Sequence, residues 1–173
     1  MLKVELLNSH HERESFDCGI EALNSYLKNV AKQHIDKGIS KTFVLIDDIQ
    51  PKCILGYMTL LLCEIKANQL PLRYAKKYPS IAPAAKLGRL AISQNKQRQG
   101  LGSLLMLNAM ERIIIISKNI GIIGFFVDAK NEAAKVFYQS YGFIALETNP
   151  LCLFLPFSVL VESFAEEIVC ETA

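Results

Sequence analysis

The stretch of the chain that decides the fold reads KLGRLAISQNKQRQGLGSLL, residues 86–105. Leu87–Ile92 has the composition of a β-strand, and the polar segment Ser93–Gln99 has that of a loop. A helix is expected from Gly100 to Lys118, because its apolar residues are numerous enough for deep burial. This strand–loop–helix unit predicts an α/β or α+β domain built in three layers.

The two glycines where this helix begins predict an anion site. Gly100 and Gly102 have no side chains, so successive backbone N–H groups can approach a ligand closely. Those N–H groups lack helical partners and lie at the positive end of the helix dipole, which favours phosphate. Lys96 and Arg98 add positive charge. The spacing lacks the third glycine of a Rossmann fingerprint and the Gly-Lys-Ser/Thr of a P-loop, and a plain helix cap is the alternative.

The rest of the chain reads as alternating strands and helices, with no internal repeat or linker. Strands are expected over Val4–Leu7, Thr42–Ile46, Ile54–Leu62, Gly121–Val127 and Leu151–Leu155. Helices are expected from Ile20 to Ile35 with Asp17 or Cys18 as the cap and Gly38 as the end, over Asn131–Ser140, and over Ser158–Val169. Lys66–Ala85 is expected to be a surface excursion with a short helix. A length of 173 residues predicts one domain, residues 1–173.

Composition excludes several classes of protein. The hydrophobic fraction of 51% excludes intrinsic disorder, and no apolar window is long enough for a transmembrane helix. The N-terminus lacks the apolar stretch of a signal peptide, which predicts a cytoplasmic protein without a membrane partner. The five cysteines are odd in number and form no C-x-x-C pair, so we expect reduced thiols and no metal site.

Charge is distributed unevenly along the chain. No acidic residue occurs between Glu64 and Glu111, whereas the net charge of the whole chain is only +2. That stretch carries eight cations: Lys66, Arg73, Lys76, Lys77, Lys86, Arg89, Lys96 and Arg98. The asymmetry predicts a polyanionic partner, with a solvated basic face as the alternative.

Two motifs resemble the GNAT superfamily of N-acetyltransferases. QRQGLG (Gln97–Gly102) is similar to the superfamily's Q/R-x-x-G-x-G/A signature, which binds the pyrophosphate of acetyl-coenzyme A. NEAAKVFYQSYGF (Asn131–Phe143) is similar to its helix–turn after the fifth strand. The resemblance implies a GNAT fold: a mixed, mostly antiparallel sheet splayed between its fourth and fifth strands and flanked by helices. It also implies acetyl-CoA as cosubstrate.

Further motifs are similar to those of the GNAT toxins of type II toxin–antitoxin systems. They are FDCG (16–19), LNSYL (23–27), GISKTFV (38–44), LGRLAI (87–92) and NPLCLFLP (149–156), and Cys18 stands where smaller residues are usual. These toxins acetylate the amino group of aminoacyl-tRNA, block translation and are restrained by a ribbon-helix-helix antitoxin. The resemblance therefore implies an aminoacyl-tRNA substrate, such an antitoxin as partner, and a possible homodimer.

The resemblance also assigns the cofactor residues. Pantetheine is expected in a gap where Leu87–Ile92 parts from Gly121–Val127, with one backbone N–H near Ile92 polarising the acetyl carbonyl. Asn131 is expected to contact the cofactor from the other side. The full set of expected cofactor residues is Leu90, Ala91, Ile92, Gln97, Arg98, Gln99, Gly100, Leu101, Gly102, Ser103 and Asn131.

Within the resemblance, Tyr138 is the expected general acid for the departing coenzyme A thiolate. Its alternative role is core packing, as for Phe137. No general base stands out, which mildly favours an α-amino acceptor, since its pKa of about 7.7 to 8 leaves much of it neutral at pH 7.

The cations that the cofactor does not need are expected to contact RNA phosphates. They are Arg73, Lys76, Lys77, Lys86 and Arg89, the last placed to reach the acceptor end of a tRNA. Two alternatives remain open from sequence: acetylation of a small amine or a peptide or protein N-terminus, and a non-enzymatic GNAT-like binding module.

Overall fold

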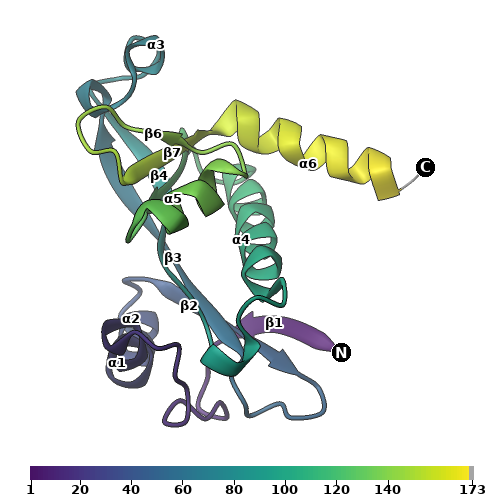
Figure 1. The fold of residues 1–173 in the computed structure, drawn as a ribbon. Coiled ribbons are helices and arrows are strands. Elements are labelled where there is room, and N and C mark those ends of the chain that lie inside the picture. The colour runs from purple at the N-terminus through teal and green to yellow at the C-terminus, as the bar shows by residue number, and fades with distance from the viewer. Residues whose placement is uncertain (172–173) are drawn as a thin grey trace. The chain divides into compact units, whose positions relative to one another are not determined.

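A computed structural model describes residues 1–171, with side chains described through residue 164 (Figure 1). In chain order the elements are β1 (Leu2–Leu6), α1 (Glu21–Asn29), α2 (Ala31–Asp36), β2 (Lys41–Asp47), β3 (Gly56–Lys66), η1 (Ala67–Gln69), α3 (Leu72–Ala75), β4 (Ile81–Ile92), η2 (Gln94–Lys96), α4 (Leu101–Ser117), β5 (Gly124–Asp128), α5 (Glu132–Gln139), β6 (Ile144–Ala145), β7 (Cys152–Pro156) and α6 (Phe157–Glu171). The seven strands are hydrogen-bonded in the order β1-β2-β3-β4-β5-β7-β6.

The contacts of the chain group into two compact units. The first comprises Met1–Leu61 and Leu87–Ala109, and the second Leu62–Lys86 and Met110–Ala173. The elements β3, β4 and α4 each contribute residues to both units. Within the part of the chain that the structure describes, no helix is long and apolar enough to cross a membrane.

The first unit is built on an antiparallel meander of β1, β2 and β3. Leu6 pairs with Phe43, and Leu45 pairs with Gly56, so the two strands predicted over Thr42–Ile46 and Ile54–Leu62 form a hairpin. Leu27 of α1, Val44 of β2 and Tyr57 of β3 are fully buried in its core. Val44, Leu45 and Ile46 are consecutive and all buried, so both faces of β2 are covered, and Val44 packs in the same apolar cluster as Leu27 of α1.

The predicted helix from Ile20 to Ile35 is wrong in two respects. The chain forms two helices, α1 and α2, because the backbone at Val30 turns to φ −121° and ψ −41°. The residue that caps α1 is Ile20, with no side-chain hydrogen bond, so neither Asp17 nor Cys18 is the cap. Gly38, with φ +70°, ends the helical segment as predicted.

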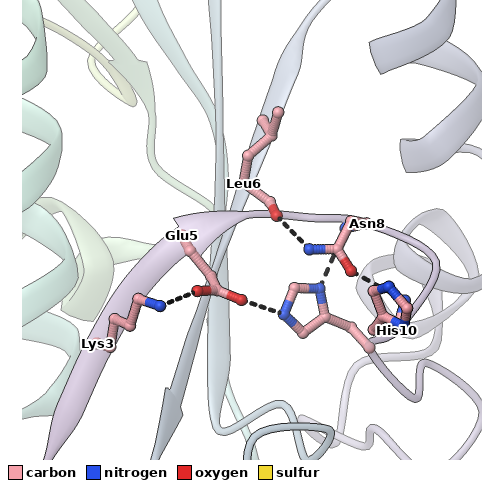
Figure 2. Close-up of polar contacts among 6 residues, drawn as sticks. Lys3, Glu5, Leu6, Asn8 and His10 are labelled. Atoms are coloured by element: carbon pink, nitrogen blue, oxygen red, sulfur yellow. Dashed lines mark hydrogen bonds and ion pairs between the residues drawn. The ribbon is translucent and has the colours of Figure 1, made fainter.

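Hydrogen bonds and an ion pair join polar side chains at the start of the chain, among them Lys3, Glu5 and Asn8 (Figure 2), and the buried His11 lies between Glu5 and Asn8. Nδ1 of His11 accepts a hydrogen bond from the Asn8 N–H at 3.1 Å, so Nε2 carries the proton and donates to Glu5 Oε1 at 2.9 Å. Lys3 Nζ lies 2.6 Å from the other oxygen of Glu5, and this lysine is the main cause of the lowered pKa of that carboxyl. Both ring nitrogens are occupied, so His11 is a structural residue and not a metal ligand.

The surface excursion expected over Lys66–Ala85 is shorter in the structure. β4 begins at Ile81 and not at Leu87, because Pro83 lies within the strand and its carbonyl accepts the Ile123 N–H at 2.9 Å. A proline lacks only the donor, so it can occupy a strand position where the acceptor alone is used. The excursion is confined to η1 and α3.

An apolar cluster of the second unit is built on β5 and β7, which pair antiparallel from Gly124↔Pro156 to Asp128↔Cys152. The Phe126 and Phe154 rings stack with centroids 4.7 Å apart, and the ring of Tyr74 from α3 stands edge-on against Phe154. The two-residue strand β6 was not predicted from the sequence, because its two half-buried residues carry no periodic pattern.

We expect Gly124→Ala to destabilise the protein by about 1–3 kcal/mol. A Cβ at this position would collide with the carbonyl oxygen of Leu155 and the ring of Phe154, and the backbone of a paired strand cannot move aside cheaply. Gly121→Ala is the matched control, since nothing lies within 4 Å of a Cβ there. Urea unfolding of both variants tests this, and equal midpoints would contradict the packing described here.

Candidate active site

The glycine loop before α4 presents free backbone donors. The Gly100 carbonyl accepts the Leu104 N–H at 3.1 Å, so Gly100 is the residue before the first helical turn. The N–H groups of Leu101, Gly102 and Ser103 have no acceptor within the described residues. Three unpaired donors at a helix N-terminus are what a pyrophosphate requires.

The backbone of this loop is locally strained. Gly100 has φ +78°, and Arg98 has φ +62°, the only positive φ outside glycine in the described chain. A left-handed non-glycine residue costs roughly 1–3 kcal/mol and persists only where surrounding contacts fix it. The loop therefore needs support from elsewhere in the fold.

That support comes from the segment Asp17–Gly19. The Gln94 N–H donates to the Asp17 carbonyl at 2.9 Å, and Gln97 Nε2 donates to the Cys18 carbonyl at 3.0 Å. Gly19 approaches Gln94 so closely that a Cβ would collide with its side-chain amide, and its φ of +84° also favours glycine. We call this contact between Asp17–Gly19 and Gln94–Gln97 the loop clip.

Asn24 of α1 holds the loop clip in place. Its amide nitrogen donates to Asp17 Oδ1 at 2.8 Å, and its oxygen accepts the Cys18 N–H at 2.9 Å. The Gly19 N–H also donates to Asp17 Oδ1, at 2.8 Å, and these two donors lower the pKa of that carboxyl. Asn24 is itself buried, with 4% of its surface exposed. In the sequence these residues belong to two short motifs, and neither motif predicts this supporting role.

Three expected cofactor side chains are partly engaged within the protein. Gln97 Nε2 also donates to the Ile92 carbonyl at 3.0 Å, and Gln99 Nε2 donates to the Asn95 carbonyl at 3.2 Å. Asn131 is the N-cap of α5, where its side-chain oxygen accepts the Ala134 N–H at 2.9 Å. These bonds shape the loop and the helix end, and contact of these residues with the cofactor stays a prediction.

The strands of the expected cofactor gap differ in length. β5 ends at Asp128, whose carboxylate pairs with Lys86 Nζ at 2.6 Å, whereas β4 continues for six residues beyond Lys86 to Ile92. At this end of β4, Ala91 is buried and Leu90 and Ile92 are half-buried. Backbone beyond the end of a neighbouring strand is free to pair with an extended ligand.

Tyr138 on α5 has a buried ring packed against Phe137 and Phe143, with centroids 5.3 and 6.0 Å away. Its hydroxyl has no hydrogen-bond partner among the described residues, and none of their buried side-chain oxygens lacks a partner, so this hydroxyl reaches the surface. Burial raises the pKa of Tyr138 to about 12. The phenol is therefore protonated at neutral pH and is a hydrogen-bond donor.

Other nucleophile and metal chemistries find no support in the described part of the chain. Burial raises the pKa of the Cys63 thiol and, with the neighbouring Asp128, raises that of Cys152 to about 12. A thiol with a raised pKa is a poor nucleophile. No group of three His, Cys, Asp or Glu residues in this part is arranged to hold a metal ion.

Four of the five cations expected to contact RNA fall into two kinds. Arg73 and Lys77 flank the Tyr74 ring, 4.8 and 5.5 Å from its centroid, and Lys76 lines a cavity of about 540 Å³ beside α3. None of these three has an ion-pair partner among the described residues. Lys86 differs, because Asp128 already neutralises it.

A long strand followed by a glycine loop with free donors at a helix N-terminus is the arrangement that the sequence motifs predict for binding acetyl-CoA. The acetyltransferase (GNAT) domain family matches residues 38–145, and the chain belongs to this family. It is thus an acetyl-CoA-dependent N-acetyltransferase, as the motifs QRQGLG and NEAAKVFYQSYGF predicted.

One relative and two solved structures are similar to this chain over most of its length. A tRNA-acetylating toxin of Mycobacterium tuberculosis is 30% identical over 141 residues, which cover 82% of this chain and 83% of the relative. The structure of AtaT complexed with acetyl-methionyl-tRNAfMet has a TM-score of 0.87 and 35% identity, with coverage of 95% of this chain and 99% of AtaT. A mutant of AtaT bound to the C-terminus of the antitoxin AtaR and acetyl-CoA has a TM-score of 0.78 and 34% identity, covering 94% of this chain and 98% of that one.

We expect Gly102→Asp to weaken binding of coenzyme A by at least roughly tenfold, because a carboxylate at this helix end repels the pyrophosphate. Gly102→Ala is the control, since it adds a side chain without charge. Calorimetric titration with coenzyme A measures both variants, and thermal unfolding checks that they fold. Unchanged affinity in Gly102→Asp would show that the pyrophosphate binds elsewhere.

Proposed function

We propose that this chain is a toxin that transfers the acetyl group of acetyl-CoA to the α-amino group of aminoacyl-tRNA and thereby blocks translation. The observation that carries the proposal is the set of unpaired cations at Arg73, Lys76 and Lys77, within a stretch of the chain that has no acidic residue. Coenzyme A needs only the charges beside the glycine loop, so the others are available to a larger polyanion. The tRNA-acetylating relative and the tRNA complex of AtaT support the same acceptor.

On the donor side, we propose that the free N–H groups of Leu101, Gly102 and Ser103 bind the pyrophosphate. Arg98 and Lys96 add charge there, and Gln97 and Gln99 hold the loop in shape. The backbone of Leu90, Ala91 and Ile92 pairs with pantetheine. One of these N–H groups stabilises the negative charge that develops on the acetyl oxygen.

On the acceptor side, the neutral α-amine attacks the acetyl carbonyl and the carbon–sulfur bond breaks. Burial raises the pKa of Tyr138 to about 12, so this phenol holds its proton more tightly than an ordinary tyrosine does. We therefore propose that Tyr138 stabilises the departing thiolate as a hydrogen-bond donor. The amine loses one proton when the amide forms, and the coenzyme A sulfur gains one proton to leave as the thiol.

The RNA contacts are unequal in this proposal. Arg73, Lys76 and Lys77 contact phosphates directly, and Arg89 contacts the acceptor end. Lys86 is expected to contribute least, since the Asp128 carboxylate lies 2.6 Å from its ammonium group.

We further propose a ribbon-helix-helix antitoxin as the protein partner, a homodimer as the assembly, and the cytoplasm as the location. The complex of AtaT with the C-terminus of AtaR supports an antitoxin of some kind. Charged tRNA and acetyl-CoA are cytoplasmic molecules, and the four described cysteines are free thiols, which suits a reducing compartment. Residues 1–173 would act as one catalytic domain.

Tyr138→Phe is expected to lower kcat by about 10²-fold or more while it preserves acetyl-CoA affinity and stability, because only the donor hydroxyl is lost. Phe137→Leu is the neighbouring control, which perturbs packing but not the hydroxyl. Single-turnover acetylation of charged tRNA measures the effect. Turnover of Tyr138→Phe within a few-fold of wild type would reduce Tyr138 to a packing residue.

Lys76→Glu combined with Lys77→Glu should weaken activity on charged tRNA and leave acetyl-CoA affinity unchanged. The dependence of binding on salt should become shallower, by roughly 0.7–0.9 in the log–log slope for each phosphate that the variant no longer neutralises. Lys52→Glu combined with Lys118→Glu changes the net charge equally at exposed positions outside the basic stretch. If both pairs weaken tRNA binding to the same extent, only overall charge matters and the basic stretch is not the RNA site.

A further inference from the structure

Arg89 on β4 lies over an aromatic ring. Its Cζ is 3.5 Å from the centroid of the Tyr26 ring of α1. Arg89 is half-buried, and it has neither an ion pair nor a hydrogen bond to any described residue. A cation removed from part of its water without a carboxylate partner is unusual unless a ligand supplies the missing charge.

The ring beneath Arg89 is held rigidly. Tyr26 is 5% exposed, and its hydroxyl lies 3.2 Å from Ser40 Oγ and 3.4 Å from His34 Nδ1. The Tyr26 ring also stacks on the ring of the fully buried Tyr57, with centroids 6.4 Å apart and an interplanar angle of 22°. The Tyr57 hydroxyl is fixed in turn by a 2.8 Å bond to the carbonyl of a helix residue, Leu23.

Stacking leaves the hydrogen-bonding capacity of the guanidinium intact. The ring contacts the face of the group, whereas its N–H donors point outward in the plane of the group. These donors form a planar fork that matches two oxygens of a phosphate or a carboxylate. A guanidinium fixed in one plane loses little freedom when it binds such a group, so the geometry favours bidentate recognition over loose attraction.

We propose that Arg89, oriented by Tyr26, is a bidentate clamp for a phosphodiester of the nucleic-acid substrate, and that Tyr26 is its positioning residue. This inference rests on the proposed function. In an aminoacyl ester the carboxylate of the amino acid is consumed by the ester bond, so phosphodiesters are the remaining anionic groups of that substrate. A free amino acid or peptide would instead offer its terminal carboxylate to the same fork.

The test compares the KM for charged tRNA among variants of the pair. Arg89→Lys keeps the charge but loses the planar fork, and Tyr26→Leu keeps a core residue but loses the ring. Each should raise KM by roughly tenfold with little change in kcat or in acetyl-CoA affinity. Tyr26→Phe retains the ring face and should restore KM to within a few-fold of wild type.

A double-mutant cycle separates positioning from general damage to the fold. Tyr26→Leu should raise KM no further when Arg89 is already alanine, because the clamp is then absent. An equal rise in both backgrounds, or a Tyr26→Phe variant as poor as Tyr26→Leu, would overturn the positioning role. Should Tyr26→Leu fail to fold, Arg89→Lys decides the matter alone, and an unchanged KM there would overturn the clamp.

The two proposals fail in distinguishable ways. If wild-type protein does not acetylate charged tRNA, the proposed function fails and the phosphate clamp falls with it. If the wild type acetylates charged tRNA but Arg89→Lys leaves KM and its salt dependence unchanged, only the clamp fails. If Arg89→Lys raises KM for peptides with a free C-terminus and not for tRNA, Arg89 binds a carboxylate instead.

Discussion

The loop clip is the constraint on which the glycine loop before α4 depends. Arg98 and Gly100 hold left-handed backbone conformations that expose three helix N–H groups, and such conformations relax unless neighbouring contacts fix them. Asp17–Gly19 supplies those contacts from almost 80 residues away in the chain, through one backbone hydrogen bond and the amide of Gln97. Asn24 bonds to both Asp17 and Cys18, so α1 is connected to the glycine loop through these two residues.

The parts of the site that sequence could predict are local. Strand β4, the glycine loop and α4 follow one another without interruption, and each has its own pattern of apolar residues or glycine. The loop clip is not local, because a buried asparagine and a lone aspartate give no periodic signal before their partners are known. The same reason hid the early start of β4, where Pro83 uses only its carbonyl, and the break at Val30, which no glycine or proline marks.

The proposed sites for acetyl-CoA and for tRNA rely on different positive groups of the chain. In the proposed mechanism, backbone dipoles bind the pyrophosphate, which needs close approach, whereas long cationic side chains bind the larger RNA. The tyrosine proposed for catalysis is buried enough to stay protonated, and this suits an acceptor amine that needs no strong base. Lys86 shows that position in a basic stretch does not make a cation available, since Asp128 on the neighbouring strand pairs with it.

Identification of the acetylated product is the most direct test that this protein acetylates charged tRNA. Purified protein is incubated with isotopically labelled acetyl-CoA and a mixture of charged tRNA, uncharged tRNA, free amino acids and a peptide, and the products are separated and analysed by mass spectrometry. We expect label only on charged tRNA, released by mild base as an N-acetyl amino acid. Label on free amines or on the peptide N-terminus, with charged tRNA unmodified, would contradict it.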